Sequence, residues 1–153
     1  MPFELDLTIT RRLVLAAVLC GLIGAERAWR NKPAGLRTHL LVGIGSTLIM
    51  LISIHMATAV PGQVADPTRI ASNVVAGLGF LGAGTIMREG ASVQGLTTAA
   101  SLWAAGAVGL AVGCGYYQAA IQGSVAILLA LEILGLAEFY YLHRDRKGGR
   151  PRP

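Results

Sequence analysis

Charged side chains in or beside apolar stretches are the residues of this sequence that could do chemistry. They occur at the ends of two apolar runs and inside the last one: Glu26, Arg27, Arg88, Glu89 and Glu132. Because burying charge in lipid is costly, such residues pair with one another, bind something, or anchor the chain at the membrane surface. For the two pairs, an ion-pair network and interfacial anchoring both stay open. For Glu132 three interpretations stay open: it is protonated, it faces the helix bundle, or it binds a partner or a cation.

The remaining polar residues show no pattern of catalysis or metal binding. His39, His55 and His143 are far apart in the sequence and follow no metal-ligand spacing. Cys20 and Cys114 do not form a C-x-x-C motif, and we interpret both as packing residues. No nucleophile stands in an evident relation to a base. We therefore expect no enzymatic activity, no bound metal and no cofactor.

A glycine-rich stretch, residues 77–84, invites a nucleotide-binding interpretation. Gly77, Gly79 and Gly82 spell G-x-G-x-x-G, which is specific only after a strand and with an acid about 20 residues on. Residues 99–103 are Ala, Ala, Ser, Leu and Trp, and no β-branched strand precedes Gly77. The match is therefore interpreted as accidental. In a bilayer these glycines survive within a helix and let neighbouring helices approach closely.

The composition indicates a helical membrane protein. Of the 153 residues, 54% are hydrophobic and 14% are charged, against about 25% charged in ordinary soluble domains. The net charge of +5 does not indicate a nucleic-acid partner, because the basic residues cluster at the ends of apolar runs. We expect an all-α polytopic protein whose Gly- and Ala-rich helices pack closely in the lipid bilayer.

Five apolar runs predict five transmembrane helices: residues 13–29, 39–60, 69–87, 95–115 and 117–142. The first run could instead belong to a signal peptide, but the acidic residues Glu4 and Asp6 do not fit the positively charged N-terminal region of such a peptide. A polar turn is expected at residues 88–94. The transmembrane domain is thus predicted to cover residues 1–142, followed by a disordered basic tail at residues 143–153.

The distribution of basic residues predicts the orientation. With five spans, ten of the thirteen Lys and Arg residues lie on the face that carries the C-terminus, and three lie on the other. Basic residues are retained on the cytoplasmic side of membranes. We therefore expect a cytoplasmic C-terminus and an external N-terminus.

Small residues at helical spacing predict where the helices approach one another. Ser101, Ala105, Gly109 and Gly113 recur every four residues, and the other candidates for close packing are Gly21, Gly79 and Gly82. Such contacts form within one chain or between chains, so a homo-oligomer is also possible. The segment Gly21–Ala25 resembles Gly79–Ala83, which is a chance similarity or a parallel repeat of a helical hairpin. A repeat would place Glu26 near Arg88 and Arg27 near Glu89.

Four segments between residues 13 and 115, in the order GAER, AGLRT, GFLGAG and GLTTAASLW, make the sequence resemble the MgtC/SapB family. The resemblance implies a bacterial inner-membrane protein with a five-helix hydrophobic domain. It also implies links to growth in low magnesium, acid stress, virulence and survival inside macrophages. The best-known member binds and restrains the membrane part of ATP synthase. That member also carries a soluble C-terminal domain, where this sequence has only a basic tail.

The sequence leads to two functional hypotheses. The first is a protein that acts by helix–helix interaction with membrane partners or with itself. The alternative is a transporter or channel for Mg²⁺ or another ion. Mg²⁺ prefers carboxylate oxygens, and only Glu132 is expected at depth in the membrane. This scarcity favours the first hypothesis.

Overall fold

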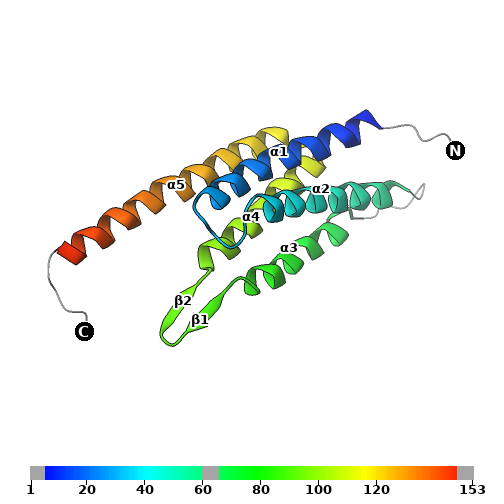
Figure 1. The fold of residues 1–153 in the computed structure, drawn as a ribbon. Coiled ribbons are helices and arrows are strands. Elements are labelled where there is room, and N and C mark those ends of the chain that lie inside the picture. The colour runs from blue at the N-terminus through cyan, green and yellow to red at the C-terminus, as the bar shows by residue number, and fades with distance from the viewer. Residues whose placement is uncertain (1–5, 60–65, 148–153) are drawn as a thin grey trace.

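The computed structural model describes residues 6–59 and 66–147, which form five helices and one short β-hairpin (Figure 1). The helices are α1 (Leu7–Trp29), α2 (Leu36–Thr58), α3 (Thr68–Ala83), α4 (Leu96–Cys114) and α5 (Tyr117–Lys147). The expectation of an all-α fold with five helices is confirmed. The predicted polar turn is an antiparallel hairpin of β1 (Met87–Glu89) and β2 (Ser92–Gln94), with Arg88 opposite Val93.

The helices differ in how completely they meet the requirements for crossing a bilayer. By length and composition, α1, α2 and α4 are long and apolar enough to cross. Helix α3 has 16 residues, about 24 Å of helix, against a hydrocarbon core of about 30 Å. The apolar part of α5 covers Tyr117–Ile133. Helix α3 therefore matches the predicted span 69–87 in position but not in full length, whereas α5, with 31 residues, covers the predicted span 117–142.

The first and fourth helices have recognisable end signals. Asp6 caps α1, because its Oδ1 accepts a hydrogen bond from the backbone N–H of Thr8 at 2.8 Å. Helix α4 is bounded by Gly95 and Gly115, both in the left-handed region with φ of +89° and +85°. A Cβ on Gly95 would collide with the carbonyl oxygen of Thr85, so the entry from the hairpin into α4 requires glycine.

Helix α4 is the centre of the bundle and packs against the other four helices. Its Ala105 and Val112 are fully buried, together with Ala16, Cys20 and Ile23 of α1. Close approach to α2 requires small residues on α4. A Cβ on Gly109 would lie 2.5 Å from the carbonyl oxygen of Gly43, and one on Gly113 would lie 2.6 Å from the Cβ of Met50. We call this contact between α2 and α4 the central seam.

The other predicted packing glycines have more space around the position of a Cβ atom. A Cβ on Gly82 would lie 3.3 Å from the Cβ of Ala99, and one on Gly21 would lie 3.7 Å from Leu36. A Cβ on Gly79 would meet nothing within 4 Å. Gly79 thus makes no close contact within the described chain, because it lies on the outer side of α3, and its contact with another chain stays a prediction.

The position of α5 corrects the expected depth of Glu132. At the start of α5, the side chain of Tyr117 accepts a hydrogen bond from Arg12 Nε at 3.0 Å, so α5 begins level with the first turns of α1. Glu132 follows about 22 Å further along α5, where it pairs with Arg30 at the other end of α1. Glu132 thus lies at the edge of the bundle rather than at mid-depth. Helix α5 continues past α1 to Lys147 (Figure 1), so residues 143–147 of the predicted tail are helical, and residues 148–153 lie outside the described part.

Candidate functional site

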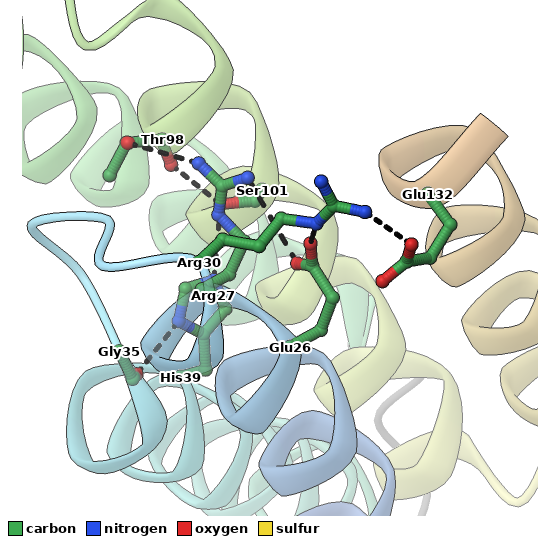
Figure 2. Close-up of polar contacts among 8 residues, drawn as sticks. All are labelled: Glu26, Arg27, Arg30, Gly35, His39, Thr98, Ser101 and Glu132. Atoms are coloured by element: carbon green, nitrogen blue, oxygen red, sulfur yellow. Dashed lines mark hydrogen bonds and ion pairs between the residues drawn. The ribbon is translucent and has the colours of Figure 1, made fainter. Parts of the chain in front are cut away.

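Four charged side chains meet where α1 ends, and they form the end cluster: Glu26, Arg27, Arg30 and Glu132 (Figure 2). Arg30 follows Glu26 by one helical turn, and its Nε lies 2.8 Å from Glu26 Oε1. Its Nη2 donates to Glu132 Oε2 on α5. Arg27 Nη1 lies 4.0 Å from Glu26 Oε2. The formal charges of the end cluster sum to zero, and Arg30 links α1 to α5.

The end cluster runs from a buried side to an exposed side. The side chains of Arg27 and Glu26 are 3% and 7% exposed, those of Arg30 and Glu132 29% and 49%. Neither carboxylate oxygen of Glu26 accepts a hydrogen bond of good geometry from a described residue, and Arg27 Nε donates none. A buried group left in this state is costly, by about 1–3 kcal/mol or more for a charge. Glu26 therefore depends on the charges of Arg27 and Arg30.

Arg30 keeps its charge at every physiological pH. The hydrogen bond to Glu132 is the main cause that raises the pKa of the Arg30 guanidinium above its ordinary value, and partial burial acts in the opposite direction. The negative charges of Glu132 and Glu26 raise the pKa further. The link between α1 and α5 is thus a permanent cation between two carboxylates.

A chain of hydrogen bonds connects the buried side of the end cluster to α2 and α4 (Figure 2). Arg27 Nη2 donates to Thr98 Oγ1 at 3.3 Å. Ser101 Oγ lies 2.9 Å from the carbonyl oxygen of Thr98 and 3.1 Å from His39 Nε2. His39 Nδ1 lies 3.0 Å from the carbonyl oxygen of Gly35. Helices α1, α2 and α4 are therefore joined at one end by polar side chains.

The distance between Ser101 Oγ and His39 Nε2 is that of a nucleophile and its general base. The sequence gives no sign of this contact. The surroundings do not resemble an active site. His39 is fully buried, Ser101 is 3% exposed, and a backbone carbonyl rather than a carboxylate faces His39 Nδ1. We interpret the contact as a hydrogen bond between helices.

The pairing of Glu26 with Arg88, which a parallel repeat would require, does not occur in the structure. Arg88 and Glu89 lie on β1 with exposed side chains, and Arg88 Nε donates to the carbonyl oxygen of Gly90 at 3.2 Å. The hairpin extends away from the helices (Figure 1), so it carries these residues off the helix end. Among the described residues, Glu26 forms its ion pairs with Arg27 and Arg30.

The sequence does contain a signal for Arg30, because Glu and Arg four residues apart meet on a helix. Thr98 and Ser101 lie three residues apart on one helix face, which predicts that they act together. Their pairing with Arg27 and His39 depends on the packing of three helices and has no sequence signal.

Helix α3 is packed on one side only and is flanked by two grooves. It buries a single face, formed by Ala71, Val74, Leu78 and Gly82. The groove between α2 and α3 has a volume of about 740 Å³. The α3/α4 groove has about 280 Å³ and is lined in part by Gly79, Gly82, Ala83, Ala99 and Trp103. No group of three or more His, Cys, Asp or Glu residues suited to a metal ion occurs in the described part of the chain.

Several apolar helices of membrane-spanning length, with the ion pairs of the described residues at one end of the bundle, define a helical membrane protein. The chain belongs to the MgtC family, whose model matches residues 13–139.

The chain is similar to named proteins of several bacteria. YhiD of Escherichia coli, whose name proposes a magnesium transporter, is 44% identical over 88% of this chain and 64% of its own length. Protein MgtC of Salmonella typhimurium is 48% identical over 76% of this chain and 48% of its own length. Protein slr0014 of Synechocystis is 44% identical over 78% of this chain and 49% of its own length. The chain thus spans about half to two thirds of these relatives. No solved structure matches it.

Proposed function

We propose that this magnesium-related membrane protein acts by helix–helix contact with another membrane protein, and that the α3/α4 groove receives the partner. The proposal rests mainly on Gly79, which lines this groove and has nothing within 4 Å of its Cβ position. Glycine and alanine on a lipid-facing groove let a second helix approach closely. Trp103, half-exposed beside them, supplies apolar contact area.

The bundle interior supports contact rather than conduction. The central seam is closed by Gly109 against the backbone of Gly43. The buried charges among the described residues, Glu26 and Arg27, are gathered at one end and face each other. Away from the end cluster and the chain of hydrogen bonds that joins it to α2 and α4, the buried polar side chains of the described residues are hydroxyl groups, such as those of Ser46, Thr47 and Ser53, whereas Mg²⁺ prefers carboxylate oxygens.

The family resemblance gives the first partner to test, the membrane part of ATP synthase, and the inner membrane as the location. The same resemblance suggests low magnesium, acid stress and life inside macrophages as the conditions to examine. A second copy of the chain is the next candidate for the α3/α4 groove. The distribution of basic residues supports an external N-terminus and a cytoplasmic C-terminus.

Growth in low magnesium of a host lacking this protein tests the proposal. Gly79→Leu fills the α3/α4 groove, and Gly123→Leu on α5 is the matched control, because a Cβ there also meets nothing within 4 Å. Both variants are expected in membranes at wild-type levels, which an immunoblot measures. Only Gly79→Leu is expected to lose growth. Equal growth of the two variants would remove the α3/α4 groove from the proposal.

Transport of Mg²⁺ is the second candidate function, favoured by the name of YhiD. Glu26 and Glu132, which share Arg30, are the carboxylates that it would use. Mg²⁺ flux into liposomes that contain only the purified chain separates the candidates. If the protein acts by contact alone, liposomes that contain it are expected to show the same Mg²⁺ flux as empty liposomes. Transport predicts a flux that Glu26→Gln reduces and that Glu89→Gln on the hairpin leaves unchanged.

A further inference from the structure

The groove between α2 and α3 differs in shape from the α3/α4 groove. On α2 its wall extends from Arg37 to Ile49, and on α3 from Leu81 back to Ile70. Twelve residue steps of helix correspond to about 18 Å. The groove therefore begins at the edge of the bundle and ends about half-way through a hydrocarbon core of about 30 Å. This length fits one chain of one lipid leaflet and is too short for a helix that crosses the bilayer.

The wall of this groove is open and mostly apolar. Leu41, Ile49 and Leu81 are exposed large side chains on it. Gly45 and Gly77 also line it, and a Cβ on either would meet nothing within 4 Å. The groove thus has room for a flexible hydrocarbon chain along both helices.

Charge is placed at the mouth of the groove. Arg37 lines the mouth with an exposed side chain and forms no ion pair with another described residue. The acids of the end cluster, Glu26 and Glu132, are already engaged by Arg27 and Arg30. Because Arg37 lies in the first turn of α2, at the edge of the bundle, it is placed at the depth of the lipid headgroups, and no described acid neutralises it. Guanidinium groups bind phosphate oxygens in a bidentate manner.

We propose that the groove between α2 and α3 holds an acyl chain of a phospholipid from the adjacent leaflet, with the anionic headgroup bound by Arg37. The hydroxyl group of Thr38, which also lines the groove, is a second donor at the mouth. The α3/α4 groove is lined by a different set of residues, except that Leu78 lines both grooves.

A second copy of the chain is the rival occupant. Asn73 lines the deeper part of the groove with an exposed side chain, and amide side chains join helices in membranes. A second copy would use Asn73, whereas a lipid would use Arg37. The two residues therefore distinguish the occupants.

Native mass spectrometry of the purified chain, titrated with phosphatidylglycerol or phosphatidylethanolamine, tests the proposal. The wild type is expected to bind the anionic lipid about fivefold more tightly, the effect of one basic residue near an anionic membrane surface. Arg37→Gln is expected to abolish this preference. Arg69→Gln is the control, because Arg69 is an exposed arginine outside the groove. This variant is expected to keep the preference for the anionic lipid. Gly77→Leu fills the groove and is expected to weaken binding of both lipids, whereas Gly123→Leu is not.

Two results would overturn the lipid site. One is equal binding of the two lipids by the wild type, or a preference that survives Arg37→Gln. The other is a dimer that excludes lipid and dissociates on Asn73→Leu, which would assign the groove to a second copy. Retained lipid binding by Asn73→Leu is the result expected for the lipid site.

Discussion

At the scale of the residue, Arg30 holds the end cluster together. It contacts Glu26 one turn earlier on α1 and Glu132 on α5. Removing Arg30 leaves Glu26, whose side chain is 7% exposed, with Arg27 at 4.0 Å as its remaining partner. A buried charge that loses its partner destabilises a protein more than the pair itself stabilises it.

The coupling of Glu26 with Arg30 is therefore expected to be large. A double-mutant cycle with Glu26→Ala and Arg30→Ala, measured by thermal unfolding in detergent, is expected to give an interaction energy of about 1–3 kcal/mol. The same cycle for Glu26 and Arg88 is the control and is expected to be additive, because Arg88 lies on the hairpin. Additivity of Glu26 with Arg30, or coupling with Arg88, would contradict the geometry of the end cluster.

The sequence predicts this cluster only in part. The buried charge of Glu26 and Arg27 follows from their place at the end of an apolar run. The choice of Arg30 over Arg88 follows from helix spacing, once the turn after α3 is known to be a hairpin. Nothing in the sequence brings His39 to Ser101, because that contact depends on how α2 and α4 cross.

At the scale of the element, small residues have opposite roles on α3 and α4. Gly79 and Gly109 both stand in Gly- and Ala-rich stripes, so sequence spacing does not separate them. In the structure Gly109 faces the backbone of α2, whereas Gly79 faces outward. The difference arises because α4 is surrounded by the other helices and α3 is packed on one side only.

Leucine at these two positions is expected to have different effects. Gly109→Leu places side-chain atoms against the carbonyl oxygen of Gly43, where backbone must move. Overpacking of this kind costs about 1–3 kcal/mol or more. Gly79→Leu is expected to leave the unfolding temperature in detergent unchanged. Equal stability of the wild type and Gly109→Leu would contradict the central seam.

At the scale of the whole molecule, the bundle has two different ends. One end joins the starts of α1 and α5 through Arg12, whose Nη1 also donates to the carbonyl oxygen of Gly113 at 2.7 Å. The other end carries the end cluster and the hairpin. Five helices follow from the apolar runs of the sequence, but the hairpin does not, because its strands have only three residues each.

Orientation in the membrane is a prediction of the basic residues. A reporter fused after Arg152 is expected in the cytoplasm, and one inserted beside Gln63 is expected outside, although both positions lie beyond the described residues. Enzymatic reporters active on only one side of the membrane make this measurement. An external C-terminal reporter would contradict the five-span arrangement.

Site-directed photocrosslinking in living cells detects contact of another protein with the α3/α4 groove. A photoreactive residue is placed at Trp103 on the groove and, as the control, at Leu129 on α5, which are exposed by 50% and 53%. Under low magnesium, position 103 is expected to give one discrete product with another membrane protein or a second copy, and position 129 none. Identical products from both positions, or no protein product from position 103, would contradict the proposed contact.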